Sequence, residues 1–169
     1  MKRVLVLGPS GSGKSTFAKN LAERLGLPWV NLDSHYWKPN WQETPEEEWR
    51  EIVGQLILQD EWVMDGNYSK TLEMRIKRAD TAIFLDIPRR VSFWRVLKRR
   101  VKHRGEVRPE LAEGCYEKID LDFLRWIYGY PKRTRPVVDR ILAENSDDTN
   151  VVVLKGSKEA GDYLSSLPS

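Results

Sequence analysis

The chain has 169 residues, of which 40% are hydrophobic and 31% charged, with a net charge of +3 at pH 7. This length suits a single domain with its own core. The chain has no apolar run of the roughly 20 residues that a membrane helix needs, and no signal-peptide pattern precedes its first apolar run. The single cysteine, Cys115, excludes an internal disulfide and favours a reducing, cytoplasmic compartment.

The first apolar run, residues 4–7, leads into a glycine-rich loop with the sequence Gly8-Pro9-Ser10-Gly11-Ser12-Gly13-Lys14-Ser15, followed by Thr16. This spacing matches the phosphate-binding loop, in which backbone amides surround a phosphate, the lysine reaches the outer phosphates and the serine hydroxyl binds Mg²⁺. Phe17, Leu21 and Leu25 then fall on one helical face. A strand before the loop and a helix after it are the context that the motif requires, so residues 8–16 are predicted to bind nucleotide phosphates.

Short apolar strands and amphipathic helices alternate along the rest of the chain. Gly26 is expected to end the first helix, and further strands are expected at residues 29–32, 62–64, 81–85 and 151–154. We expect further helices near residues 44–57, 72–78, 89–104, 120–128, 134–144 and 157–164. Thr44 and Glu47 form a predicted capping box, and Ser157 is the predicted cap of the last helix. The aromatic residues 34–41 show no period and predict a structured loop over a site.

This alternation predicts an α/β fold with a five-stranded parallel sheet that helices cover on both faces. Ligands of such sheets bind beyond the carboxyl ends of the strands. The segments at those ends are the phosphate loop, Asp33, Asp65, Asp86 and Gly156. The sequence therefore places polar and acidic side chains where a site is expected.

Five segments, in order, resemble the adenylate kinase-like group of P-loop kinases. They are residues 8–16, Met64-Asp65-Gly66, Leu85-Asp86-Ile87-Pro88, the arginine-bearing residues 95–100, and the turn Gly156-Ser157-Lys158. Residues 37–41, 65–68 and 113–117 also resemble a branch labelled DNA topology modulation proteins. The resemblance implies the three-layer P-loop NTPase fold as one domain over residues 1–169, with an acceptor-site insertion at about 34–59 and a helical lid at about 100–118.

The resemblance also implies the donor site. ATP is expected on residues 8–16. Mg²⁺ is expected to be held directly by Ser15 and by Asp65 through a water molecule of the ion's shell. Asp86 is the alternative carboxylate, and either one can instead cap a helix. The adenine is expected to lie near four residues: Arg95, Gly156, Ser157 and Lys158.

Phosphoryl transfer needs charge neutralisation and alignment more than covalent help. Lys14 supplies one positive charge, and Arg99 and Arg100 are expected to close on the transferring phosphate, because a guanidinium binds phosphate oxygens in pairs. The alternative for these arginines is a solvated basic helix face. Asp33 is expected to orient or deprotonate an acceptor hydroxyl, or to cap the turn after it.

Two departures concern the acceptor. Kinases of the adenylate type usually follow Asp-Gly with Phe-Pro-Arg, whose arginine holds the acceptor phosphate, whereas this chain has Asn67-Tyr68-Ser69 and its next arginine is Arg75. Asp33 follows the second strand, where hydroxyl-acceptor kinases of the superfamily often carry an aspartate. The prediction is an ATP-dependent kinase, monomeric or homodimeric, that acts on a nucleotide, a nucleoside or a hydroxylated metabolite. The alternative is an ATP-binding regulator of DNA, which the basic stretch at 89–108 permits although no DNA-reading motif is present.

Overall fold

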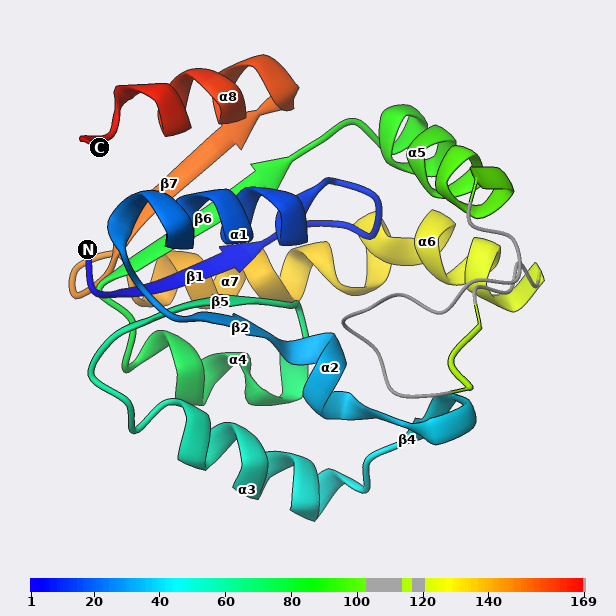
Figure 1. Cartoon of the computed structure of the whole chain (residues 1–169), viewed down its shortest axis with the longest axis horizontal. Coiled ribbons are helices and arrows are strands. Elements are labelled where there is room, and N and C mark those ends of the chain that lie inside the picture. The colour runs from blue at the N-terminus through cyan, green and yellow to red at the C-terminus, as the bar shows by residue number, and fades with distance from the viewer. Residues whose placement is uncertain (103–113, 117–120, 169) are drawn as a thin grey trace.

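The computed structural model describes residues 1–102, 114–116 and 121–168. Five strands form one parallel sheet in the order β2-β5-β1-β6-β7 (Figure 1). Their bounds are Arg3–Leu7 for β1, Trp29–Asn31 for β2, Trp62–Asp65 for β5, Thr81–Asp86 for β6 and Asn150–Lys155 for β7. The predicted five-stranded parallel sheet is confirmed.

Helices cover both faces of the sheet, which confirms the predicted three layers. The helices are α1 (Lys14–Leu25), α2 (Leu32–Tyr36), α3 (Glu46–Leu56), α4 (Ser69–Ile76), α5 (Arg89–Lys102), α6 (Leu121–Arg133), α7 (Arg135–Glu144) and α8 (Gly156–Ser166). Helices α1 and α8 lie on one face, α3, α4 and α7 lie on the other, and α5 and α6 lie beyond the carboxyl ends of the strands (Figure 1). Within the described residues, no helix is both long and apolar enough to cross a membrane.

The central strand β1 places the phosphate loop in the middle of the sheet edge. Val4 and Val6 pack under α1 and α8, while Leu5 and Leu7 pack toward α3, α4 and α7, and all four are fully buried. A strand buried on both faces reads as a continuous apolar run, which is the pattern that the sequence shows here. Because β5 and β6 flank β1, the loop has one neighbouring strand on each side.

The segment after β2 differs from the prediction. The strand ends at Asn31, whose side chain accepts a hydrogen bond from the amide of Asp33 at 3.0 Å and begins α2. The expected loop at 34–41 therefore contains the end of a short helix and the first strand of a small hairpin, β3 (Trp37–Lys38) with β4 (Gln42–Glu43). An asparagine side chain that bonds to a nearby amide competes with strand pairing, which explains the early end of β2.

Two predicted helix caps are wrong. Thr44 does not cap α3, whose cap residue is Pro45, because the Thr44 hydroxyl donates to the carbonyl of Tyr36 at 2.5 Å and closes the hairpin. Ser157 does not cap α8, since Lys155 is the cap residue and its amide donates to Glu159 at 2.6 Å. Each hydroxyl instead makes a tertiary contact, which local sequence patterns do not encode.

Candidate active site

The phosphate loop joins β1 to α1. The cap residue Gly13 has no side chain to bond to the first amides of α1, so these amides and the positive end of the helix are available to an anion. Gly11 has a φ of 80°, and a side chain there would collide with the carbonyl of Ser92 on α5. Lys14 and Ser15, in the first turn of α1, are partly exposed. This geometry can hold phosphate groups as the motif predicts.

Ser15 and Asp65 meet beside the loop. The Ser15 hydroxyl donates to Asp65 at 2.6 Å, and the indole N–H of Trp29 donates to the other carboxylate oxygen at 2.9 Å. Burial raises the pKa of Asp65, while the bond from Ser15, the charge of Lys14 and the bond from Trp29 act in the opposite direction. Mg²⁺ prefers oxygen ligands of this kind and usually keeps several waters, so this hydroxyl–carboxylate pair fits the ion.

Asp86, the alternative carboxylate for Mg²⁺, has a different environment. Its two oxygens accept hydrogen bonds from the guanidinium of Arg135 at 2.7 and 3.4 Å. The carboxylate is therefore already neutralised by an ion pair at the end of β6. Asp65 has a hydroxyl and an indole as partners, and it lies next to the loop serine.

The turn that follows β5, residues 66–68, contacts the phosphate loop through Asn67. The Gly8 amide donates to the Asn67 side-chain oxygen at 3.1 Å, and the Asn67 side-chain N–H donates to the Gly8 carbonyl at 2.8 Å. The carboxamide thus satisfies both backbone polar groups of Gly8. This pair of bonds fixes the first glycine of the loop relative to β5.

The same turn reaches Asp33 through Tyr68. The Tyr68 hydroxyl donates to the Asp33 carboxylate at 2.8 Å, and the backbone of Tyr68 has a φ of 31°, in the left-handed region. Burial and the nearby negative charge of Asp33 raise the pKa of Tyr68, so the phenol stays protonated and remains a donor. Asp33 itself lies in the first turn of α2 and is half-buried.

Arg75, on α4, forms hydrogen bonds with the backbone of this turn. Its guanidinium donates to the carbonyls of Gly66 at 2.9 Å, Tyr68 at 3.1 Å and Asn67. The side chain is fully buried, and burial lowers the pKa of Arg75 to about 9. Arg75, the first arginine after Asp65-Gly66, therefore supports the backbone and is not directed at a ligand.

Aromatic rings surround the Tyr68–Asp33 pair. Tyr36 packs with Tyr68 at a centroid distance of 4.7 Å and with Trp49 at 5.0 Å. Trp49 is buried in the core, whereas Tyr36 and Tyr68 are half-exposed. Asp33 thus lies at the edge of an aromatic cluster, with rings that a flat or apolar ligand can contact.

Arg95 connects the loop with the start of α8. Its guanidinium donates to the carbonyl of Ser12 at 3.1 Å and to the hydroxyl of Ser157 at 2.7 Å. Arg95 thus joins Ser157, at the start of α8, to the phosphate loop. The expected role of Arg95, Gly156, Ser157 and Lys158 toward an adenine stays a prediction. Arg99 lies one helical turn further along α5 and is half-buried, and the side chain of Arg100 lies outside the described residues.

Sequence reasoning missed three contributors to this site. The Trp29 indole that bonds to Asp65 gave no signal, because Trp29 reads as an ordinary strand residue. Asn67 stood out only as a departure from Phe-Pro-Arg, and nothing pointed to its bonds with Gly8. Arg75 stood out only as the next arginine after Asn67-Tyr68-Ser69, and nothing pointed to its bonds with the backbone of this turn.

Comparisons with known proteins agree with this geometry. Residues 4–119 match the AAA domain family. The chain is 27% identical over 178 residues to the "Uncharacterized protein YqaC" of Bacillus subtilis (strain 168), covering 98% of both chains. It is 32% identical over 123 residues to the "Putative adenylate kinase" of Thermococcus kodakarensis (strain ATCC BAA-918 / JCM 12380 / KOD1), covering 69% of this chain and 64% of that one.

A solved structure shares the fold. The shikimate kinase from Acinetobacter baumannii in complex with shikimate superposes with a TM-score of 0.60 at 17% identity, covering 98% of this chain and 89% of that one. The finer assignment to the topology modulation branch stays a prediction. The loop, the sheet and these matches together show that the chain belongs to the AAA domain family and to the adenylate kinase-like P-loop kinase superfamily.

Proposed function

We propose that this protein is a kinase that transfers the γ-phosphoryl group of ATP to the hydroxyl of a small molecule. One observation carries the proposal: the turn at residues 66–68 is bonded to the phosphate loop through Asn67 and to Asp33 through Tyr68. A donor loop and an acceptor-side carboxylate are thereby held in one fixed relation. Phosphoryl transfer depends on this kind of alignment.

In the proposed reaction, ATP lies on residues 8–16 and Lys14 stabilises the outer phosphates. Mg²⁺, held by Ser15 and through water by Asp65, supplies charge neutralisation when it is bound. Asp33 accepts the hydroxyl proton of the acceptor, whose oxygen then attacks the γ-phosphorus. The bond from that phosphorus to the bridging oxygen breaks, and ADP leaves. The Tyr68 hydroxyl keeps the carboxylate in position, in the way that an orienting group supports a general base.

Other residues complete the proposed donor site. Arg95 and the turn at 156–158 border the adenine, and Arg99 and Arg100 approach the transferring phosphate. The lid at about 100–118 falls largely outside the described residues. The described residues 114–116 contact the insertion at about 34–59, since the Trp41 indole donates to the carbonyl of Tyr116 at 2.9 Å. This contact supports an acceptor position between the insertion and the lid.

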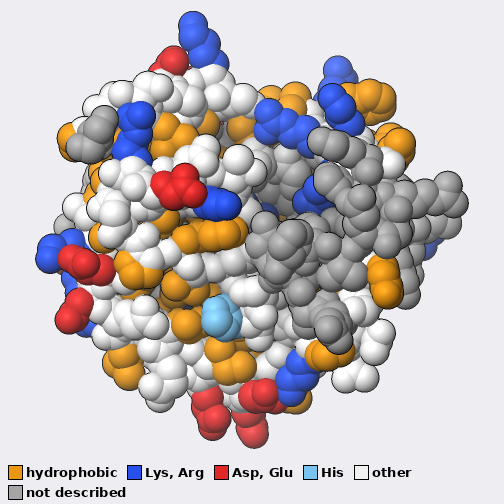
Figure 2. Space-filling model, in the orientation of Figure 1, with side chains coloured by type: hydrophobic (Ala, Val, Ile, Leu, Met, Phe, Trp, Pro, Cys, Tyr) orange, Lys and Arg blue, Asp and Glu red, His pale blue; other side chains and the backbone are white. Residues whose placement is uncertain are grey.

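The acceptor that fits this site best carries no phosphate of its own. Arg75, the arginine nearest the position that holds an acceptor phosphate in adenylate-type kinases, is fully buried against backbone carbonyls. Residues 34–59 hold five glutamates against Lys38 and Arg50. Figure 2 shows acidic side chains gathered along the edge where Figure 1 has the start of α3, whose first turn is Glu46, Glu47 and Glu48. A nucleoside or another neutral hydroxylated metabolite suits such surroundings.

The test is ADP release in a coupled assay across nucleosides, nucleoside monophosphates and hydroxylated metabolites. At least one uncharged acceptor is expected to raise turnover above ATP hydrolysis alone. Lys14→Ala should abolish that turnover, and Asp33→Asn should lower kcat by about 10²–10⁴-fold, the usual contribution of a general base. Asp60→Asn, at an exposed position, is the matched control and should change nothing. Turnover that no acceptor stimulates, or an Asp33→Asn variant with full activity, would contradict the proposal.

A further inference from the structure

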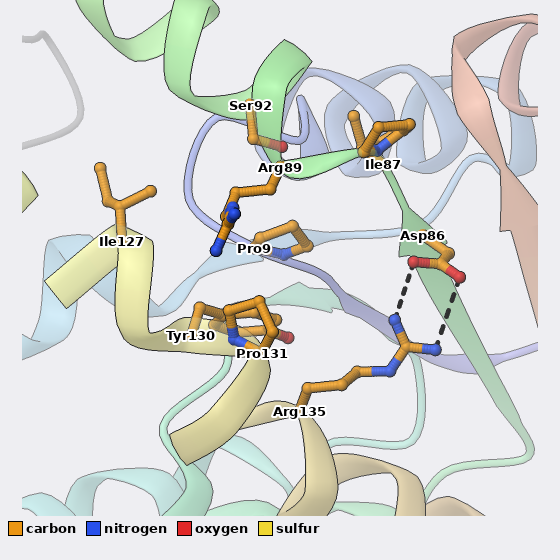
Figure 3. Close-up of a pocket in the computed structure, with 10 residues that line it drawn as sticks. Pro9, Asp86, Ile87, Arg89, Ser92, Ile127, Tyr130, Pro131 and Arg135 are labelled. Carbon is orange, nitrogen blue, oxygen red and sulfur yellow. Dashed lines mark hydrogen bonds and ion pairs between the residues drawn. The ribbon is translucent and has the colours of Figure 1, made fainter. Parts of the chain in front are cut away.

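A second hollow lies on the other side of the phosphate loop from Asp33. It is a pocket of about 240 Å³ between the loop, the junction of β6 with α5, and α6 (Figure 3). Pro9 and Ile127 provide apolar walls from the loop and from α6. Asp33 and Asp65 follow β2 and β5, whereas this pocket lies at the end of β6, which pairs with the opposite edge of β1. The pocket is therefore separate from the proposed acceptor site.

Two buried hydroxyls line this pocket without a hydrogen-bond partner. Ser92, on α5, is 1% exposed, and Tyr130, on α6, is 4% exposed. Among the described residues, neither the Ser92 hydroxyl nor the Tyr130 hydroxyl has a hydrogen-bond partner. Buried polar groups are normally paired, and each unpaired one lowers stability. A ligand with acceptor oxygens would satisfy both hydroxyls.

The charge of the pocket favours an anion. Arg135 is neutralised, since it pairs with Asp86 at 2.7 Å and with Asp139 at 2.7 Å. Arg89, by contrast, lines the pocket with its guanidinium (Figure 3), and the guanidinium carbon also lies 4.1 Å from the centre of the ring of Tyr128, an exposed residue on α6. Among the described residues no carboxylate forms an ion pair with Arg89. The pocket also lies at the first turn of the 14-residue helix α5, whose positive end adds to the attraction.

We propose that this pocket binds a small organic anion, a carboxylate with an apolar body of about the size of benzoate. The carboxylate oxygens take the guanidinium N–H groups of Arg89 and the hydroxyl protons of Ser92 and Tyr130. The apolar body lies against Pro9 and Ile127. The donors and the apolar walls together distinguish this ligand from a bare inorganic anion, which would leave the apolar walls without contacts.

The test uses the full chain without ATP, so its outcome does not depend on the proposed kinase activity. Sodium benzoate is titrated at constant ionic strength, with sodium chloride as the reference salt. Binding is followed by calorimetry and by the melting temperature. Benzoate is expected to bind saturably to the wild type and to raise its melting temperature. Benzyl alcohol, which has a similar shape without the charge, is expected to bind at least tenfold more weakly.

Three variants locate the binding. Arg89→Gln should weaken benzoate binding at least tenfold, and Tyr130→Phe should weaken it several-fold. Arg90→Gln removes the same charge from the neighbouring exposed position and should bind benzoate as the wild type does. Absence of saturable binding, or equal losses in Arg89→Gln and Arg90→Gln, would overturn the assignment of this site. Equal binding of benzyl alcohol and benzoate would overturn its anionic character.

Discussion

The two sides of the phosphate loop are built in opposite ways. On the β5 side, polar groups are paired with one another: Asn67 with Gly8, Tyr68 with Asp33, and Ser15 with Asp65. On the β6 side, the Ser92 and Tyr130 hydroxyls are buried and have no hydrogen-bond partner within the part of the chain that the structure describes. We therefore expect the β5 side to keep its geometry with or without a ligand. On the β6 side, the two hydroxyls would gain hydrogen-bond partners only when a ligand binds.

This difference follows from how each side is connected. On the β5 side, residues 65–68 form one short segment that the buried Arg75 supports, and this segment supplies one partner of each pair. The pocket on the β6 side is assembled from the loop, α5 and α6, which are far apart in the chain. One short segment can bring its side chains to all of these partners at once, while a junction of three elements leaves a space among them.

The largest effect is expected from removing the support of the β5 side. Arg75→Met leaves the carbonyls of Gly66, Asn67 and Tyr68 without their donor, and each buried unpaired group costs about 1–3 kcal/mol. Because methionine also removes a buried charge, we expect a net loss of about 2–4 kcal/mol in the free energy of unfolding. Denaturant unfolding at pH 7 measures it. Lys77→Met, at an exposed position beside the end of the same helix, is the control, and an equal loss in both variants would contradict the role of Arg75.

A smaller loss is expected when the turn is detached from the loop. Asn67→Ala removes two hydrogen bonds to Gly8, each with a net value of about 0.5–1.5 kcal/mol, so ATP affinity should fall about tenfold. Asn67→Asp keeps an acceptor for the Gly8 amide, loses the donor to its carbonyl and adds a negative charge beside the phosphates, so it should bind ATP more weakly still. Calorimetric titration with ATP and Mg²⁺ measures both variants, with exposed Asn20→Ala as control. Wild-type affinity in Asn67→Asp would show that this contact does not support the loop.

Two tyrosines offer a direct comparison of the two sides through the same substitution. Tyr68→Phe removes a hydroxyl that donates to Asp33 and should cost about 1 kcal/mol of stability. Tyr130→Phe removes a buried hydroxyl that has no partner, so without ligand it should leave stability unchanged or raise it by up to about 1 kcal/mol. Denaturant unfolding of the two variants in the same buffer decides the matter. Equal losses of stability in the two variants would mean that the Tyr68 and Tyr130 hydroxyls do not differ in hydrogen bonding.

The parts of the molecule that sequence reasoning could predict are those with a local pattern. The loop motif, the apolar strands and the helix end at Gly26 each have such a pattern, and the structure agrees with all three. The partners of Thr44 and Ser157 could not be read in this way, because each hydroxyl bonds to a residue brought near by the fold. Both residues fit a cap locally, and tertiary contacts decided otherwise.

The buried arginine and the pocket were beyond prediction for a related reason. Arginine is mostly exposed in proteins, so no pattern in the sequence placed Arg75 in the core. Whether the Ser92 and Tyr130 hydroxyls find hydrogen-bond partners depends on the distance between α5 and α6, and no spacing along the chain determines that distance. Asp33 and Asp65 were found because the carboxyl ends of parallel strands share one edge of the sheet.

The smallest expected effect concerns Asp65, the carboxylate that accepts a hydrogen bond from Ser15 beside the phosphate loop. Burial raises the pKa of Asp65 above its ordinary value of 3.8. The folded state therefore binds a proton more readily than the unfolded state, and the stability that this group contributes falls as pH rises through that window. Asp65→Asn can still accept from Trp29 and donate to Ser15, so at pH 7 without Mg²⁺ it should melt higher than the wild type, by about 2–4 °C for each kcal/mol gained.

The difference in melting temperature between Asp65→Asn and the wild type should shrink as pH is lowered toward the ordinary carboxyl pKa, because the wild-type group is then protonated too. Thermal unfolding from pH 4 to pH 8 measures it, with Asp60→Asn as the exposed control. With Mg²⁺ and ATP the order should reverse, since the ionised carboxylate then has a cation to stabilise it. An Asp65→Asn variant that melts below the wild type at pH 7 without Mg²⁺ would mean that the bonds from Ser15 and Trp29 already offset the cost of burial. Asp65 would then be a structural carboxylate like Asp86, and the paired β5 side would have no need of an ion to complete it.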